Sequence, residues 1–137
     1  MTHNEARELI LTTFRAGWND TTYSVAYDNM VFDPPIGTTM WARVMIEFFQ
    51  GKQASIGSTN NRLFRRLGMV TIHVCTPMGD ATYNNDINCQ TVLNLFEGKN
   101  VSGLRFEEST IETIGEDEAG KWYVQAVKTY FRFEQVK

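Results

Sequence analysis

The chain has 137 residues, 42% of them hydrophobic and 21% charged, and a formal net charge of -3 at pH 7. These values are typical of one folded domain, so we interpret residues 1–137 as a single domain rather than a disordered chain. The mild negative charge offers no general attraction to polyanions, and the apolar runs are well under the ~20 residues of a membrane-spanning helix. We therefore expect no membrane partner and no specific nucleic-acid partner.

The two cysteines, Cys75 and Cys89, are too few for a disulfide framework. The first residues lack the basic start and the apolar core of a secretory signal. In a reducing compartment, cysteines of this kind are expected to be buried thiols. We therefore expect an intracellular protein with reduced cysteines.

The first predicted element is a helix between Thr2 and Gly17. The segment Thr2-His3-Asn4-Glu5 fits a capping box, in which Thr2 and Glu5 each accept a hydrogen bond from a free backbone N–H. Gly17 is expected to end the helix, because glycine adopts the left-handed conformation after a helix at little cost. The residues with the spacing of one helix face are Ala6, Leu9, Ile10, Thr13 and Phe14.

Two strands are predicted next, at residues 24–31 and 39–49, with a turn at 33–37 in which Pro34 and Pro35 break the sheet. Residues of the second strand alternate between two faces. One face is a candidate core face and contains Ala42, Val44, Ile46 and Phe48. The other is still half apolar and contains Trp41, Arg43, Met45, Glu47 and Phe49.

Residues 50–61 are rich in Gly, Ser, Asn and Gln, which predicts a long, mobile hairpin loop. A strand is expected at 62–76, and Pro77 ends it. Its inward residues are Val70, Ile72 and Val74, and Thr71, His73 and Cys75 lie on the opposite face. Asp80 can then cap a second helix that runs to about Phe96. The buried stripe expected for this helix is Cys89, Val92, Leu93 and Phe96.

After Glu97-Gly98 closes that helix, two strands are predicted at about 104–114 and 121–134, joined by the acidic turn 115–120. The predicted order is α-β-β-β-α-β-β. Short turns between strands favour antiparallel pairing. We therefore predict an α+β fold in which an antiparallel β-sheet is flanked by two α-helices, both on one face of the sheet.

Few residues suit catalysis or metal binding. His73 and Cys75 lie two positions apart on one strand, so a Cys–His nucleophile pair can be drawn there. No third group is placed to orient the base, and a small buried thiol beside a half-buried histidine is the favoured interpretation. Two histidines and two cysteines cannot make an ordinary zinc site without carboxylates, and the acids at 107–118 match no EF-hand loop. We expect no catalytic residues, no metal site and no cofactor.

One compact basic patch, Arg62, Arg65 and Arg66 around Phe64, stands out in the sequence. Basic and aromatic side chains together can hold single-stranded nucleic acid. However, the rest of the chain is acidic, and three arginines would release few counterions. A solvated strand end is a common alternative. A third interpretation is that the patch meets the acidic region 107–118 of a neighbouring copy.

Two strands, 39–49 and 121–134, are apolar on both faces, whereas a sheet with one solvated face should alternate apolar with polar residues. Two modest helices cannot cover both faces, which favours an interface on the other face. The alternative is that the sheet curls and covers itself, as small barrels do. The long loop 50–61 suits a subunit that reaches onto a neighbour. Opposite charges on different patches suit a head-to-tail contact, which can close into a ring.

A series of motifs in this order resembles one known family. They are Val25-Ala26-Tyr27-Asp28-Asn29, Phe32-Asp33-Pro34-Pro35, Trp41-Ala42-Arg43-Val44, Gln53-Ala54-Ser55-Ile56-Gly57, the block from Asn61 to Val70, Thr76-Pro77-Met78-Gly79, Phe96-Glu97-Gly98-Lys99 and Trp122-Tyr123-Val124-Gln125-Ala126-Val127. Over nearly the whole chain they resemble the tail-terminator-like proteins of tailed bacteriophages. The chain departs from that family at Asp80, where a second glycine is usual, and at Thr129-Tyr130, where Ile-Pro is usual.

The resemblance implies a structural virion protein of the tail or neck, assembled in the host cytoplasm. It implies a homo-oligomer, a hexameric ring, that caps the finished tail tube, ends its polymerisation and offers the surface for head–tail joining. The implied partners are the tail tube protein and the head–tail connector protein, and the role needs no cofactor. Two alternatives remain open, a head-completion or connector adaptor of the phage neck and a small enzyme that uses His73 and Cys75.

Twelve residues are predicted to lie at the subunit interface. They come from the second face of strand 39–49, the loop 50–61, the basic patch and the acidic region. They are Trp41, Arg43, Met45, Gln53, Ser55, Arg62, Phe64, Arg65, Arg66, Glu107, Glu108 and Glu116.

Overall fold

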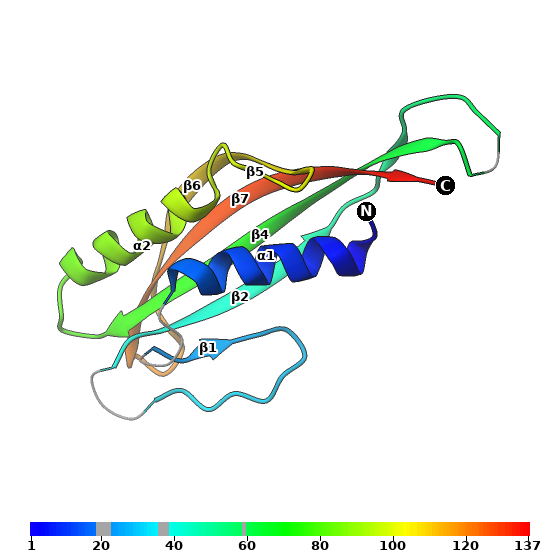
Figure 1. Ribbon diagram of the computed structural model, residues 1–137. Helices are drawn as coiled ribbons and strands as arrows, with labels where there is room; N and C mark the ends of the chain where they lie inside the picture. Colours follow the sequence, from blue (N-terminus) through cyan, green and yellow to red (C-terminus); the bar gives the residue numbers. More distant parts are fainter. Residues whose placement is uncertain (19–22, 36–38, 59) are drawn as a thin grey trace.

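The computed structural model describes residues 1–18, 23–35, 39–58 and 60–137. Both helices pack on the same face of one sheet, which confirms the predicted α+β class (Figure 1). The elements are α1 (His3–Gly17), β1 (Val25–Ala26), β2 (Trp41–Phe48), β3 (Lys52–Gln53), β4 (Leu63–Pro77), α2 (Tyr83–Phe96), β5 (Asn100–Val101), β6 (Leu104–Glu116) and β7 (Trp122–Val136). None of the helices in the described ranges is long and apolar enough to cross a membrane.

The strands follow the spatial order β1-β2-β4-β7-β6-β5, with β3 added beside the start of β4. β1 runs parallel to β2, whereas the other pairings within the described ranges are antiparallel. The prediction of a purely antiparallel sheet is therefore wrong at this edge. The strand expected at 24–31 has only two residues, because the chain leaves the sheet after Ala26. The chain then turns back, so that β2 runs in the same direction as β1. Part of the turn expected at 33–37 lies outside the described residues.

The capping box at the start of α1 is confirmed. Glu5 N donates to Thr2 Oγ1 and Thr2 N donates to Glu5 Oε2, both at 3.2 Å. The helix ends at Gly17 as predicted, but Gly17 is its last residue and does not adopt the left-handed conformation expected behind the helix. A Cβ atom on Gly17 would overlap the side chain of Leu95 on α2. Glycine therefore allows the two helices to approach each other closely.

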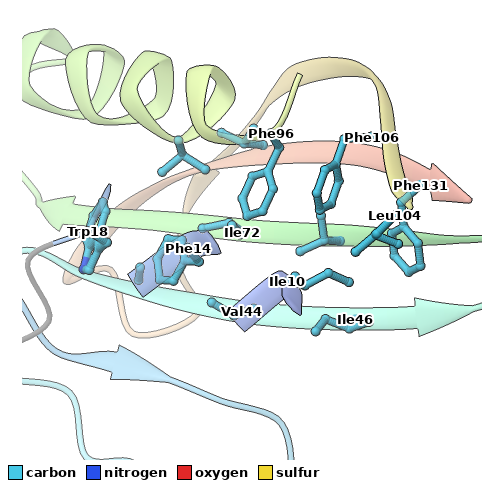
Figure 2. Packing of buried hydrophobic residues seen from close by; sticks show 14 of the residues in the cluster. Ile10, Phe14, Trp18, Val44, Ile46, Ile72, Phe96, Leu104, Phe106 and Phe131 are labelled. Carbon is cyan, nitrogen blue, oxygen red and sulfur yellow. The ribbon is translucent and has the colours of Figure 1, made fainter. Parts of the chain in front are cut away.

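The core lies between the helices and one face of the sheet (Figure 2). Burying one large apolar side chain stabilises the folded state by about 1.5–3 kcal/mol. The predicted inward residues of β2 and β4 are buried, apart from Phe48, which is half-buried. Three of the four residues predicted for the stripe of α2 are buried, and Leu93 is half-buried. The buried side chains labelled in Figure 2 are Ile10, Phe14, Trp18, Val44, Ile46, Ile72, Phe96, Leu104, Phe106 and Phe131.

The start of α2 differs from the prediction. The helix begins at Tyr83 behind Thr82, which makes no side-chain cap, and the Asp80 carboxylate instead accepts from Asn84 Nδ2 at 3.0 Å. A buried amide that the sequence did not indicate anchors the helix. Asn85 Nδ2 lies within 2.9 Å of the Val74 carbonyl and 3.2 Å of the Tyr123 carbonyl. This amide therefore ties α2 to β4 and β7.

The two central strands are longer than the helices that cover them. β4 and β7 pair along their whole length, from Leu63 opposite Val136 to Pro77 opposite Trp122. Each has 15 residues and spans ~50 Å, whereas the 15 residues of α1 span ~22 Å. One end of the strands consequently projects past the helices (Figure 1). We call this projection, residues 50–58, 60–66 and 134–137, the arm.

The loop predicted at 50–61, of which residue 59 lies outside the described ranges, contains the short strand β3. β3 pairs with β4 through Lys52 opposite Arg65 and Gln53 opposite Phe64. The Ser55 hydroxyl accepts a hydrogen bond from Leu63 N at 3.0 Å. The loop therefore folds back onto β4, and its polar composition reflects exposure on both sides.

Candidate interaction surface

The face of the sheet opposite the helices, here called the open face, is built by alternate residues of the three long central strands. Because strand side chains alternate, these positions point away from the core residues between them. Cross-strand register places them in rows, such as Trp41, Cys75 and Val124 in one row. The face comprises Trp41, Arg43, Met45, Glu47, Leu67, Met69, Thr71, His73, Cys75, Val124, Ala126, Lys128, Tyr130 and Arg132.

One end of the open face is covered by the chain itself. The Phe32 ring packs 5.0 Å from the Trp41 ring, which meets Trp122 edge-on at 5.9 Å. Together with Ala26, Cys75 and Val124, these residues form a second, smaller buried cluster. Trp41, a predicted interface residue, is only 7% exposed and lies inside this cluster. Self-covering therefore accounts for part of the apolar surface that the sequence placed on this face.

The rest of the open face carries an uncovered apolar patch. Phe49 is 40% exposed, Leu67 36% and Tyr130 51%, and Met45 and Met69 beside them are half-buried. Phe49 and Tyr130 lie with ring centroids 6.4 Å apart. These five residues, which we call the apolar patch, form a continuous surface between the covered end and the arm. Sequence alternation pointed to Met45 in this position and missed Leu67 and Met69, although both alternate with buried residues of β4.

The predicted basic patch lies on the arm, where each arginine already has a partner in its own chain. Arg65 pairs with Glu134 at 3.6 Å, and Arg62 Nε donates to the Gly57 carbonyl at 3.1 Å. Arg66 Nε donates to Gln135 Oε1 at 3.3 Å, and its guanidinium lies 5.1 Å from the centre of the Phe64 ring. The predicted interface residues Gln53 and Ser55 lie beside this patch. Gln53 belongs to β3, the outer strand of the arm, and Ser55 follows that strand in the chain.

The predicted acidic region does not form one surface. Glu107 pairs with Arg132 at 3.4 Å, near the exposed Glu108, whereas Glu116 lies at the far end of β6 opposite Tyr123. From Tyr123 to Glu134, which is opposite Arg65, the strand rises by about 35 Å at ~3.3 Å per residue. The two ends of the molecule therefore carry opposite charges, arginines on the arm and carboxylates in the turn behind β6.

His73 and Cys75 line a hollow at the covered end of the open face, next to Trp41, Arg43 and Asp117. Burial raises the pKa of the Cys75 thiol to about 12. Burial, and then the nearby charges of Arg43 and Lys128, lower the pKa of His73. Both groups are therefore neutral near pH 7, while a nucleophilic cysteine acts as the thiolate. The geometry brings the pair together without activating it.

The cysteines are both free and buried, as expected. In the described part of the chain, no group of three or more His, Cys, Asp and Glu side chains is arranged to hold a metal ion. The indole Nε1 of Trp41 is buried without an acceptor among the described residues.

No family model matches the sequence, and no curated protein matches it significantly. One solved structure, of a protein without a descriptive name, is similar over 96% of this chain and 96% of its own, with a TM-score of 0.58 and 17% sequence identity. At that identity the similarity concerns the fold alone.

Proposed function

We propose that this protein is a structural subunit that assembles with copies of itself into a ring at the end of a phage tail tube. The observation that carries the proposal is the apolar patch on the open face. Exposed apolar surface of this kind, rimmed by the charged residues Glu47, Lys128 and Arg132, is typical of a protein interface. The two helices leave it bare because both pack on the opposite face.

The arm adds the area that the apolar patch alone lacks. A stable interface buries about 800 Å² on each partner, which is more than five partly exposed side chains provide. The arm projects beyond the core and offers a polar, ordered surface continuous with Leu67 and Phe49. A neighbour seated on the apolar patch would also contact the arm.

The distribution of charge supports a head-to-tail contact rather than a two-fold one. Arginines lie at one end of β7 and carboxylates at the other, so identical ends would repel and unlike ends attract. A head-to-tail contact between identical subunits closes into a ring when its rotation permits. This arrangement agrees with the hexameric ring implied by the family resemblance.

The resemblance supplies the biological context of the proposal. Its motifs fall in the central strands, with Trp41–Val44 in β2, Asn61–Val70 running into β4, and Trp122–Val127 in β7. As a tail terminator, the ring would cap the tail tube protein, stop further polymerisation and present the surface that joins the head connector. The mechanism is steric, because one side of the ring imitates a tube subunit and the other lacks the surface that recruits the next ring. Such a mechanism needs neither catalysis nor a cofactor.

A departure from the family pattern favours one alternative, a head-completion or connector adaptor. Where the family has Ile-Pro, this chain has Thr129, which is buried against Ser109 with 2.6 Å between the hydroxyl oxygens, and the exposed Tyr130. Tyr130 belongs to the apolar patch, so the departure alters the proposed contact surface itself. A changed contact surface would suit a different neighbour in the neck.

Two measurements test the proposal. Sedimentation velocity of the purified protein, alone and mixed with tail tubes, should reveal a ring-sized species in at least one condition. A protein that stays monomeric and ignores tubes contradicts the proposal. Electron microscopy of assembled particles with a labelled subunit then separates the two roles, because a terminator lies on the tube end and an adaptor on the head connector.

A further inference from the structure

Two arginines face each other across neighbouring strands near the arm. Arg105 on β6 lies directly opposite Arg132 on β7, so both side chains leave the same face of the sheet. Like charges in directly opposite positions destabilise a sheet. Glu107 neutralises Arg132 at 3.4 Å, whereas Arg105 has no carboxylate partner among the described residues. The Arg132 atom that approaches Glu107 is Nε, 3.4 Å from Glu107 Oε1.

These arginines line a cavity of 260 Å³ at the base of the arm. Its wall also includes Arg65 and Glu134, which pair with each other at 3.6 Å, and the turn at Ser102. The pairs Arg65–Glu134 and Arg132–Glu107 are each close to neutral, which leaves the charges of Arg105 and of the Met1 ammonium, which donates to the Glu134 carbonyl at 3.2 Å, without a carboxylate partner among the described residues. A carboxylate from another chain would find an unpaired arginine, Arg105, in the wall of this cavity.

We propose that this cavity, the arginine cavity, receives the acidic turn 115–120 of a second copy of the chain, with Glu118 placed against Arg105. The inference rests on the head-to-tail assembly proposed above and names the contact that makes it. Within one chain the turn cannot reach the cavity, because Trp122 and Arg132 are ten positions apart on β7, or about 33 Å at ~3.3 Å per residue.

The acidic turn is built to present a carboxylate. Asp117 Oδ1 accepts hydrogen bonds from Lys121 N at 2.9 Å and Trp122 N at 3.2 Å, and Gly120 N donates to the Asp117 carbonyl at 3.0 Å. This fixes the backbone of the turn and uses the Asp117 side chain internally. Glu118 is exposed and has no ion pair within the described ranges. A preformed turn loses little conformational freedom on docking.

The carboxylates around the arginine cavity favour a single acidic side chain over the backbone of a nucleic acid. Glu107 and Glu134 stand beside the arginines, so a strand of successive phosphates would meet two negative charges along with the positive charges of the site. One glutamate, in contrast, meets Arg105 alone. The charges at the site thus match an acidic turn.

Cross-linking of two single-cysteine variants tests the contact without disturbing its charges. Ser102→Cys places a thiol on the cavity wall, and Ala119→Cys places one in the turn beside Glu118. The native cysteines are buried and react slowly. The two full-length variants are mixed and treated with a short bis-maleimide, and Ser102→Cys mixed with Gln90→Cys, exposed on α2, serves as the control pair. We expect covalent dimers from the 102–119 pair and about tenfold fewer from the control.

Charge reversal identifies the ion pair. Adding Arg105→Glu to the Ser102→Cys chain should reduce the dimer yield about tenfold, the usual scale for losing one charged contact. Adding Glu118→Arg to the Ala119→Cys chain at the same time should restore it. A dimer yield no higher than the control, or a yield that ignores both reversals, overturns the inference.

The same samples separate this inference from the proposed ring. If wild-type protein sediments as a ring while the 102–119 pair does not cross-link, the ring stands and the contact is wrong. If the pair cross-links with the expected charge dependence while no ring-sized species forms with or without tail tubes, the contact stands and the ring is wrong.

Discussion

Gly68 on β4 lies directly opposite Phe131 on β7, and the Phe131 ring occupies the space that a side chain at position 68 would need. A Cβ atom there would also lie 2.5 Å from the Glu47 carbonyl oxygen. Because a backbone atom cannot rotate away, Gly68→Ala should destabilise the fold by about 1–3 kcal/mol, the usual cost of overpacking. Urea denaturation followed by tryptophan fluorescence measures this change.

A double-mutant cycle shows whether the aromatic ring is responsible. In the Phe131→Leu background, the smaller side chain frees part of the space above position 68, so Gly68→Ala should cost less than in the wild type. The residual cost reports the clash with the Glu47 carbonyl. An equal cost in both backgrounds would mean that Phe131 has no part in the effect.

The buried amide of Asn85 leads to a second prediction. Its Nδ2 group serves the Val74 carbonyl, and its Oδ1 accepts a contact from Cys89 Sγ at 3.2 Å. Asn85→Ala leaves buried acceptors unsatisfied, which costs about 1–3 kcal/mol, and should loosen α2 from the sheet. Thermal unfolding by circular dichroism measures the loss. Asn84→Ala, one position earlier and exposed, is the matched control and should change stability by less than about 0.5 kcal/mol.

Local signals in the sequence account for much of the fold. The Thr2–Glu5 box and the apolar spacing after it predict α1, and strict alternation predicts the core face of β2. Asn85 is a residue that such local signals do not explain. Asparagine is unfavourable inside a helix, and its role here depends on the carbonyls of two strands that are distant in sequence. The parallel pairing of Val25 with Ala42 also depends on the path of the chain, which no local pattern encodes.

The sequence predicts a second apolar face on the sheet, but it does not predict which part of that face is covered or how the charged residues are arranged. Alternation indicates two apolar faces, but it cannot reveal that Phe32 folds back over Trp41 and shelters one end. A cluster of charges in the sequence also need not form one surface, since Glu107 and Glu116 belong to one acidic stretch of the sequence yet lie near opposite ends of β6. To predict that Arg105 faces Arg132, the register between β6 and β7 must be known. The alternation of β6 does not give this register, because bulges interrupt it.

The apolar patch gives a third prediction. Tyr130→Glu places a charge in the centre of the proposed contact, and since Tyr130 is 51% exposed the fold itself should lose less than about 0.5 kcal/mol. Self-association should weaken at least tenfold, because a charge cannot be buried there without a partner. Analytical ultracentrifugation over a concentration series measures it. Tyr83→Glu, 73% exposed on α2 and away from the open face, should associate like the wild type.

The burial of Cys75 gives a prediction about pH. The folded protein holds the pKa of this thiol at about 12, above its ordinary value of 9.0, so folding favours the protonated form. This contribution is complete below pH 9 and declines as the pH rises from 9 toward 12, because the unfolded chain loses the proton first. Cys75→Ala should therefore lose less stability over that range than the wild type. Urea midpoints at pH 8 and 10.5 compare the two proteins, and parallel declines would contradict the prediction.

The arm gives the last prediction, which separates two roles of its arginines. Arg65→Glu should weaken ring assembly without unfolding the domain, since the exposed pair Arg65–Glu134 contributes at most about 1 kcal/mol to folding. Exchanging both residues, Arg65→Glu with Glu134→Arg, restores the pair within the chain but relocates the charge at the arginine cavity. If Arg65 serves only its own chain, the exchange recovers assembly in sedimentation experiments. If a neighbouring copy reads the charge at this position, assembly stays weak while urea denaturation shows normal stability. We expect the first result, because Arg65 and Glu134 both line the cavity and together are close to neutral.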